Sequence, residues 1–402
     1  MSNKKILLLT TIYPAADLRY GTPSVHYFTK EWVKMGYEVK VIHYQAVYPK
    51  ILYFFAKLFR DKIASLTGAV VFMEPEKEDK KYLMDGVDVL RIPIFKRIPH
   101  GPYTKKTILR QVEKILKINK KDNFKPDMII GHFSNPQLKI VNELKREYQV
   151  RTCMIMHDNG KSIKKVYKKE YLLLMDNIDI WGYRSKPIKK EFEKEYGIQH
   201  ESFYCYSGIP VNYILDLNVR LFEGNLTRFV FVGELIERKC PIALIPVINS
   251  IYPKKEFHIS YIGKGNELSK MKSLSSSLDL NDNISFLGHI PRNEILNILD
   301  ESECMIMISA NETFGLVYLE AMGRGCITIG SKNQGIDGVI IDGFNGFLCL
   351  EGNQDDLKMI LKRINSLSSI ERRQISQNAI DTVKELTDFK AAKKYIAEVD
   401  KL

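Results

Sequence analysis

The chain has 402 residues, 45% of them hydrophobic and 27% charged, a composition that excludes a disordered chain and suggests two or three globular domains. No apolar run reaches about 18 residues, so no transmembrane helix is predicted, and the apolar run at 6–9 is too short for a signal peptide. Six scattered cysteines without a Cys-x-x-Cys pair indicate neither a disulfide framework nor a zinc site and fit a reducing cytoplasm.

Positive charge is concentrated in the first half of the chain. Residues 1–200 hold 38 Lys and Arg against 22 Asp and Glu, a net charge of +16, whereas residues 201–402 hold 22 against 26, a net charge of −4. This excess fits either a solvated basic face or a surface that meets membrane lipid or a pyrophosphate-bearing substrate. Nucleic acid is not supported, because no zinc finger, RNA-binding signature or helix-turn-helix pattern occurs.

Apolar strands alternate with amphipathic helices along the first half. Strands are expected at 6–11, 39–43, 126–131, 152–156 and 178–183, with helices at 25–35, 138–147 and 187–196. Such an alternation predicts a parallel, doubly wound sheet.

One segment departs from this alternation. In residues 50–66, Leu52, Phe55, Phe59, Ile63 and Leu66 recur at helical spacing, and basic side chains lie away from that stripe. An aromatic stripe opposed to basic residues suits a helix at the surface of an anionic membrane. A helix packed on its own domain would show the same stripe, so both interpretations stay open.

The second half repeats the alternation of strands and helices. Strands are expected at 229–232, 257–262, 284–287, 305–309, 327–330 and 346–350, and helices at 240–250, 266–277, 292–300, 355–366, 371–386 and 389–401. Residues 218–226 show no clear period, which indicates a domain boundary. We therefore predict an N-terminal domain over 1–205 and a C-terminal domain over 206–386, with the last helix, about 387–402, available to pack back on the first domain.

Two glutamates frame a strand-to-helix turn in the second half. Glu312 follows an apolar strand, and Glu320 lies about two turns into the helix that opens after Gly315. The free N–H groups and the dipole of that helix start favour an anion such as a phosphate. Two carboxylates beside a phosphate seat can accept hydrogen bonds from sugar hydroxyls, so the motif suits a nucleotide sugar.

A second motif lies at the end of the strand at 229–232. After Gly233, a short loop delivers Arg238 and Lys239 to the start of the next helix. Basic side chains in that place can neutralise a diphosphate without a metal. A plain surface-exposed Arg-Lys pair is the competing interpretation, and the nearby glutamate motif disfavours it.

Together these motifs resemble the donor domain of the retaining glycosyltransferases of family four, which have the GT-B fold. The matching pieces follow the family's order over about 120 residues: Phe-Val-Gly…Arg-Lys at 231–239, Tyr-Ile-Gly-Lys-Gly at 261–265, Phe-Leu-Gly at 286–288, Glu-x7-Glu at 312–320, Glu-Ala-Met-Gly-Arg-Gly at 320–325 and Asp-Gly-Phe-Asn-Gly-Phe at 342–347. The resemblance implies an α/β fold of two Rossmann-like, doubly wound parallel-sheet domains that face each other across a cleft.

The resemblance also implies a role for each matching residue. Lys239, with Arg238 beside it, would hold the donor pyrophosphate, Glu312 would contact hydroxyls of the donor sugar, and Glu320 would accept hydrogen bonds from the ribose. The remaining donor contacts would be the backbone N–H groups of Gly315 and Leu316 at a phosphate and the loop Gly288-His289-Ile290 beside the base.

Two positions depart from the family's pattern. The family often has arginine directly after the glycine of the first loop, where this chain has Glu234, and it often has glutamate where this chain has Gly338. A carboxylate at the first position would repel a diphosphate, so Glu234 is expected to turn away while Arg238 compensates.

The first half matches the family more loosely. Gly21 stands in the loop that the family uses to cover the donor phosphate and the acceptor, although a simple turn would also explain this glycine. His157 ends a strand where the family keeps a histidine near the reacting sugar carbon, and strand ends form the site in a doubly wound sheet. His132 also ends a strand, but for this residue a packed loop side chain is the favoured interpretation.

The implied reaction moves a sugar, with retention, from a nucleotide sugar, expected to be a UDP-sugar, to a saccharide acceptor. The basic half and the 50–66 segment favour a lipid-linked acceptor at the cytoplasmic membrane face, as in bacterial surface polysaccharide synthesis. No cofactor and no obligatory metal are expected, because no aspartate-rich metal motif occurs in the donor half. A soluble transferase for a small acceptor or a glucan, a GT-B sugar-nucleotide epimerase and a non-catalytic nucleotide-sugar binding protein remain as alternatives.

Overall fold

The structure is a computed structural model that describes residues 4–16, 23–55, 58–59, 76–99, 101–199, 201–216 and 220–401. Gly21 and most of 56–66 lie outside the described residues. Contacts divide the chain into two compact units: unit 1 comprises Met1–Arg184, Ile188–Tyr206 and Asp388–Leu402, and unit 2 comprises Ser185–Pro187 and Ser207–Thr387.

Unit 1 is built on an eight-stranded sheet in the order β3-β4-β2-β1-β5-β6-β7-β8. All neighbouring strands run parallel except β3, which pairs antiparallel with β4 at the sheet edge. The strands are β1 (Lys5–Thr10), β2 (Glu38–Val47), β3 (Lys80–Met84), β4 (Val87–Phe95), β5 (Met128–His132), β6 (Arg151–Met156), β7 (Ile180–Tyr183) and β8 (Ser202–Tyr204).

Helices cover both faces of this sheet, and β1 shows why. Successive side chains of a strand point to opposite faces, so Leu7 and Leu9 join one buried cluster, whereas Ile6 and Leu8 join the other. The first cluster includes residues of α3 (Lys105–Lys121), α4 (Gln137–Tyr148), α5 (Ser162–Tyr167), α6 (Tyr171–Asp176) and α7 (Lys186–Tyr196). The second cluster includes residues of α1 (Ser24–Lys34) and α14 (Asp388–Asp400).

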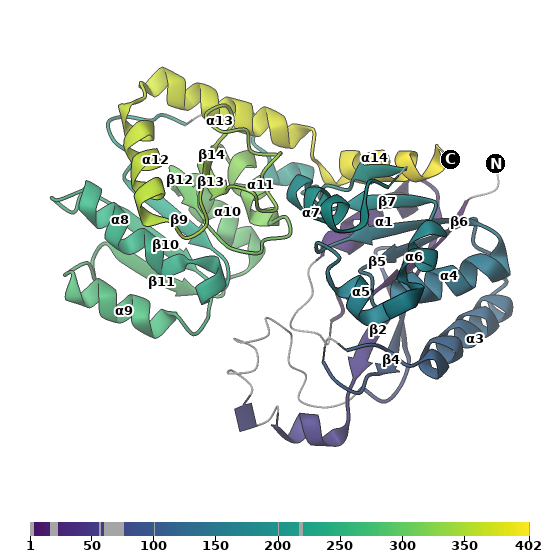
Figure 1. The fold of residues 1–402 in the computed structure, drawn as a ribbon. Coiled ribbons are helices and arrows are strands. Elements are labelled where there is room, and N and C mark those ends of the chain that lie inside the picture. The colour runs from purple at the N-terminus through teal and green to yellow at the C-terminus, as the bar shows by residue number, and fades with distance from the viewer. Residues whose placement is uncertain are drawn as a thin grey trace. The chain divides into compact units, whose positions relative to one another are not determined.

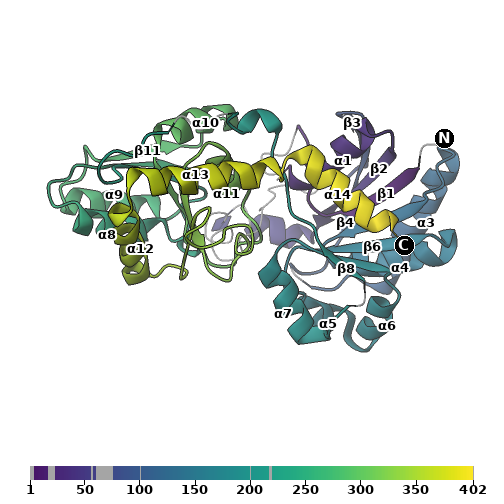
Figure 2. The same cartoon turned by 90° about the horizontal axis from the view of Figure 1, so that it is seen from above.

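The last helix of the chain belongs to unit 1. Helix α14 lies beside α1 (Figures 1 and 2), and the Trp32 indole Nε1 donates a hydrogen bond to the carbonyl oxygen of Ala392 at 3.0 Å. The Tyr395 ring packs edge-on against both Phe28 and Trp32. These buried aromatic contacts fix the chain terminus on the N-terminal sheet.

Unit 2 has a six-stranded, all-parallel sheet in the order β11-β10-β9-β12-β13-β14. Its strands are β9 (Arg228–Val232), β10 (His258–Ile262), β11 (Ile284–Gly288), β12 (Cys304–Ile306), β13 (Ile327–Ser331) and β14 (Phe347–Cys349). Its helices are α8 (Leu244–Ile251), α9 (Leu268–Ser277), α10 (Arg292–Glu301), α11 (Leu316–Gly323), α12 (Gln354–Ser366) and α13 (Ser369–Lys384). Helix α8 packs with α9 and α12, and α11 packs with α10 and α13.

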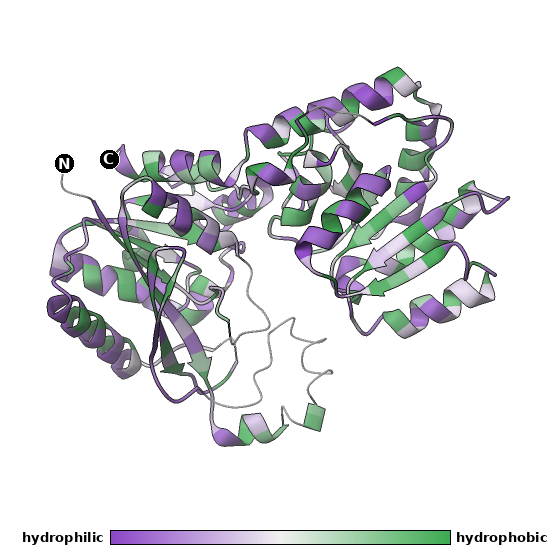
Figure 3. Ribbon diagram, turned by 180° about the vertical axis from the view of Figure 1, so that it is seen from behind, coloured by the Kyte–Doolittle hydropathy of each residue, from purple (hydrophilic) through white to green (hydrophobic). Residues whose placement is uncertain are grey.

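Hydropathy explains the layers of both units. The strands of unit 2 are coloured mostly hydrophobic, the visible strands of unit 1 mix both colours, and most helices carry one hydrophobic and one hydrophilic side (Figure 3). Parallel strands that are covered on both faces need such continuous apolar runs.

The helix expected over 240–250 begins later than predicted. Residues 237–239 and 241–243 form two short 3-10 turns, and α8 begins at Leu244. Cys240 between these turns is left-handed with φ of 52°, a conformation that an α-helix does not continue through. Arg238 and Lys239 therefore lie in a tight turn ahead of the helix and not in its first turn.

Candidate donor site

The site of unit 2 is formed where β9 and β12, which pair in the sheet, reach their carboxyl ends. In a parallel sheet the loops at this edge meet. The N–H of Ala310 donates to the carbonyl oxygen of Arg238 at 2.8 Å. In return, Nη1 of Arg238 donates to the carbonyl oxygens of Ala310 and Asn311 at 3.2 and 3.3 Å. Arg238 thus holds the two loops together, and part of its donor capacity is used there.

Lys239 and Glu312 form an ion pair between these loops. Both side chains are only 12% exposed, and the Ser309 hydroxyl adds a longer hydrogen bond to the same carboxylate oxygen at 3.4 Å. An ammonium group has three donors, so Lys239 can bond a phosphate while it keeps Glu312. The two residues predicted to contact pyrophosphate and sugar are therefore brought together.

Gly315 is the N-cap residue of α11. Its φ is +79°, a left-handed conformation, and a Cβ atom there would lie 2.6 Å from the ring of Tyr318. That ring is fixed beneath the turn, because the Tyr318 hydroxyl donates to the Met307 carbonyl oxygen at 2.6 Å. The N–H groups of Leu316 and Val317 then open the helix, where a first turn provides no intrahelical partner. The turn thus has the backbone geometry that the predicted anion site requires, and the site itself stays a prediction.

Glu320 is buried, with 3% of its surface exposed, and pairs with Arg292 at the start of α10. Nε of Arg292 donates to Oε1 of Glu320 at 2.7 Å, and Nη2 donates to the same oxygen. Oε2 bonds to no side chain among the described residues and is available to a ligand hydroxyl. The arginine holds the carboxylate in a fixed orientation.

Sequence reasoning missed Arg292. A signal did exist, because an arginine in the first turn of a helix is unfavourable beside the positive end of the helix dipole. Its presence there indicates a partner elsewhere, but nothing local identifies that partner as Glu320.

The loop predicted to border the base follows β11. The N–H of Gly263 donates to the carbonyl oxygen of Gly288 at 2.7 Å, so the ends of β10 and β11 adjoin. A Cβ atom on Gly263 would lie 1.8 Å from the carbonyl oxygen of Gly233, which explains why a glycine is required. His289 is exposed and Ile290 partly buried, and the pair of Arg292 with Glu320 connects this loop to α11.

The two departures from the family's pattern have plain structural counterparts. Glu234 is exposed at the surface of unit 2, so its carboxylate can remain solvated. Gly338 has φ of +103°, a conformation that a glutamate would adopt only with strain.

In unit 1, His157 follows β6 and lies next to His132 at the end of β5. Nδ1 of His132 is 2.9 Å from Nε2 of His157, and Nε2 of His132 is 3.2 Å from the Tyr395 hydroxyl. The ring of Phe133 stacks on His157 with centroids 3.9 Å apart. His132 is fully buried, and its two ring nitrogens contact His157 and the last helix. Gly21 lies outside the described residues.

Burial lowers the pKa of both His132 and His157 well below the ordinary value, and the nearby Arg184 lowers both further. In the unfolded chain a histidine titrates near pH 6.5. Below that pH the unfolded state binds more protons than the folded one, so acid destabilises unit 1.

We expect the free energy of unfolding of unit 1 to fall by about 1–3 kcal/mol between pH 7.5 and 5.5. Both tryptophans, Trp32 and Trp181, lie in unit 1, so denaturant unfolding followed by tryptophan fluorescence reports on this unit. The His132→Gln variant should show a shallower loss. A stability that is equal or higher at pH 5.5 would contradict the effect of the histidine pair.

Among the described residues, no group of three or more His, Cys, Asp or Glu side chains could hold a metal ion. Independence from metals stays a prediction.

Part of the chain, which includes this site, matches a known family model. Residues 217–382 match the family model described as glycosyl transferases group 1. An uncharacterised glycosyltransferase of Methanocaldococcus jannaschii is 26% identical over 246 residues, which cover 60% of this chain and 66% of that protein. The amylovoran biosynthesis glycosyltransferase AmsK of Erwinia amylovora is 23% identical over 392 residues, 90% of each chain.

Solved structures confirm the predicted fold class. Sucrose-phosphate synthase from Thermosynechococcus elongatus is similar with a TM-score of 0.70 at 16% identity, over 99% of this chain and 98% of that one. The Anabaena protein HepE in complex with UDP is similar with a TM-score of 0.68 at 16% identity, over 99% and 100% of the two chains. The two doubly wound units are thus those of a GT-B glycosyltransferase fold.

Proposed function

We propose that the chain moves a sugar from a UDP-sugar to a saccharide acceptor with retention at the anomeric carbon, because residues 217–382 match the family model described as glycosyl transferases group 1. One observation carries the proposal: the ion pairs of Glu312 with Lys239 and of Glu320 with Arg292 flank the open helix start at Leu316. This arrangement offers an anion seat between two oriented carboxylates, which suits a diphosphate between two sugars.

In the proposed reaction the bond between the anomeric carbon and the diphosphate oxygen breaks. Lys239, Arg238 and the amide groups at the start of α11 stabilise the negative charge that develops on the leaving nucleoside diphosphate, an electrostatic role that needs no obligatory metal. The acceptor hydroxyl oxygen then bonds to the same face of that carbon, and its proton passes to the leaving phosphate. His157 is proposed to contact the reacting sugar.

The choice of UDP and of a surface polysaccharide draws on the relatives. HepE was solved in complex with UDP and with UDP-glucose, and the Erwinia amylovora relative is named for amylovoran biosynthesis. These names favour a UDP-sugar donor and a role in bacterial polysaccharide synthesis.

The proposal is tested by thermal stabilisation of the purified protein with a panel of nucleotide sugars, because a ligand that binds the folded state raises its stability. A UDP-sugar should raise the melting temperature most, and incubation with a membrane lipid extract should give an α-linked product from an α-linked donor. Conversion of the donor without any acceptor would indicate an epimerase. Binding without turnover on any acceptor would indicate a binding protein.

The exposed helix after β2 supports a membrane contact. Residues 50–55 and 58–59 are helical, and Ile51, Phe54, Phe55, Leu58 and Phe59 are 46–63% exposed at the spacing of one helix face. The buried Tyr53 faces the other way and accepts a hydrogen bond from the N–H of Tyr48 at 3.2 Å. Of the predicted stripe, Phe55 and Phe59 are exposed and Leu52 is partly buried. Ile63 and Leu66 lie outside the described residues. The exposed phenylalanines favour a contact with lipid.

None of the described helices combines the length and the apolar character that a bilayer span requires.

Replacing Phe55 and Phe59 together by serine should lower binding to phosphatidylglycerol vesicles by about tenfold or more, because each buried phenylalanine contributes about 1.5–3 kcal/mol. Sedimentation with the vesicles measures this change. The control is Ile370→Ser in unit 2, which removes an apolar side chain that is 82% exposed. Equal sedimentation of the phenylalanine variant and the wild type would remove the membrane contact.

A further inference from the structure

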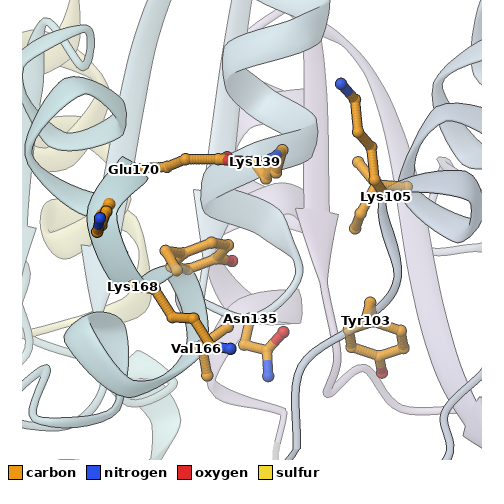
Figure 4. A pocket seen from close by; sticks show the side chains of 10 residues that line it. Tyr103, Lys105, Asn135, Lys139, Val166, Lys168 and Glu170 are labelled. Atoms are coloured by element: carbon orange, nitrogen blue, oxygen red, sulfur yellow. Dashed lines mark hydrogen bonds and ion pairs between the residues drawn. The ribbon is translucent and has the colours of Figure 1, made fainter.

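A separate cavity of about 430 Å³ lies in unit 1, within the size range of small-molecule sites. Lysines dominate its lining: Lys105, Lys139, Lys168 and Lys169 are opposed by a single carboxylate, that of Glu170, which leaves a formal charge of +3. Figure 4 shows Tyr103 and Lys105 on one wall, Lys168 and Glu170 on the opposite wall, and Asn135 and Lys139 between them.

The cavity is built from the loops and helices that follow the carboxyl ends of the strands. Lys105 begins α3 after β4, and Asn135 follows β5. Residues 166–170 comprise the end of α5 and the 3-10 turn Lys168–Glu170, which come after β6. This edge is where ligands bind in doubly wound sheets. Two hydrogen bonds fix the floor: the Tyr167 hydroxyl donates to the Ser134 carbonyl oxygen at 2.6 Å, and Nδ2 of Asn135 donates to the Gly101 carbonyl oxygen at 3.1 Å.

Most of the positive charge in the cavity has no ion-pair partner among the residues that the structure describes. Lys139 pairs with Glu170, but no carboxylate of a described residue lies within 4.0 Å of the ammonium groups of Lys105, Lys168 or Lys169. Like charges that converge on one cavity repel each other. An anion in the cavity would relieve that repulsion.

The backbone at Lys168 is strained. Its φ of 51° and ψ of −124° fall in a region that residues other than glycine rarely occupy, at a cost of about 1–3 kcal/mol. A lysine kept in such a conformation at the rim of a cavity indicates that its placement has a function.

A further cation lies next to the cavity. The ammonium group of Lys96 lies 4.9 Å from the centroid of the Tyr103 ring, which lines the cavity. Lys96 is 9% exposed, and no carboxylate among the described residues pairs with it. Burial lowers the pKa of Lys96 to about 8, so an anion nearby would stabilise its charged form.

We propose that this cavity binds a phosphate or diphosphate ester carried by the acceptor. The inference rests on the proposed transferase function and deepens it, because it gives the acceptor a chemical class. Lysines on opposite walls can hold the ester oxygens, while the apolar surfaces of Tyr103, Ile108 and Tyr167 suit a sugar ring or the first carbons of a lipid. The same ester could belong to a sugar phosphate in solution or to a lipid-linked diphosphate.

The test is calorimetric titration with inorganic pyrophosphate. All titrations use the Lys239→Ala variant, in which pyrophosphate binding at the donor site is reduced. The cavity variant carries Lys105→Gln and Lys169→Gln in addition, which removes two positive charges from the cavity. The matched control is Lys117→Gln with Lys120→Gln, two exposed lysines on the same helix as Lys105.

The cavity variant should raise the pyrophosphate dissociation constant by roughly tenfold, and the control should leave it unchanged. Equal affinity of the cavity variant and its background, or no binding to either, overturns the inference.

Two further binding experiments, on proteins that keep Lys239, distinguish a free phosphate ester from a lipid-linked one. A hexose 1-phosphate in solution stands for the free ester, and phosphatidylcholine vesicles that carry a polyprenyl diphosphate stand for the lipid-linked one. Binding of either probe that is weakened in the Lys105→Gln, Lys169→Gln variant supports the site. The probe that binds then identifies where the phosphate ester comes from. The proposed transferase function fails separately, if no nucleotide sugar stabilises the protein while pyrophosphate still binds the cavity.

Discussion

Lys239→Ala is expected to lower kcat for sugar transfer by about 10²–10³-fold, because removing one preorganised group that stabilises developing charge typically costs that much. Lys239 is mostly buried and already oriented by Glu312, so little reorganisation is needed when charge develops on the leaving diphosphate. KM for the donor should change less than kcat, since the charge on the leaving oxygen grows in the transition state.

Initial rates at saturating donor measure this effect. Lys254→Ala is the control, because it removes an exposed lysine of the same unit and should leave kcat unchanged. Circular dichroism melting of both variants separates lost catalysis from lost folding. A kcat of Lys239→Ala within about twofold of the wild type would contradict a role at the leaving group, given the expected effect.

Arg292→Ala is expected to weaken donor binding by roughly tenfold or more, because Glu320 then loses the hydrogen bonds that orient it. The buried carboxylate is left without its cation. We therefore expect the free energy of unfolding of unit 2 to fall by about 2 kcal/mol, less than for a fully buried pair, because Arg292 itself is partly exposed.

The conservative variant distinguishes this positioning role from a merely structural one. Arg292→Lys keeps the positive charge but should rescue only part of the donor affinity, since a lysine lacks the forked donor geometry. Loss of stability with unchanged donor affinity in Arg292→Ala would contradict the positioning role.

The fold could be predicted from the sequence wherever local pattern and tertiary packing agree. The apolar run of β1 and the stripe of α1 indicate one parallel, doubly covered sheet, and the structure has it. Strand β4 was not predicted, because it includes Pro93 and a buried Arg91. An ion pair with Glu76 at 3.0 Å stabilises Arg91 there. Helix α3 escaped although Ile108, Val112 and Ile115 mark its buried face at helical spacing.

The sequence motifs of the site could be predicted, but the side-chain contacts between distant residues could not. The glutamates and the Arg238-Lys239 turn were visible because each depends on a short stretch of chain. The partnership of Arg292 with Glu320 joins two helices 28 residues apart in sequence, and that of His132 with His157 joins two strand ends. Such contacts depend on strand order, which no local spacing encodes.

The central claim is that the oriented carboxylates beside the start of α11 bind a nucleotide sugar. Calorimetric titration of UDP into the wild type, Glu320→Ala and the exposed control Glu301→Ala tests it most directly. We predict one UDP site per chain, with a dissociation constant at least about tenfold higher in Glu320→Ala and unchanged in Glu301→Ala. Equal UDP affinity in all three proteins, or no UDP binding at all, would contradict the account.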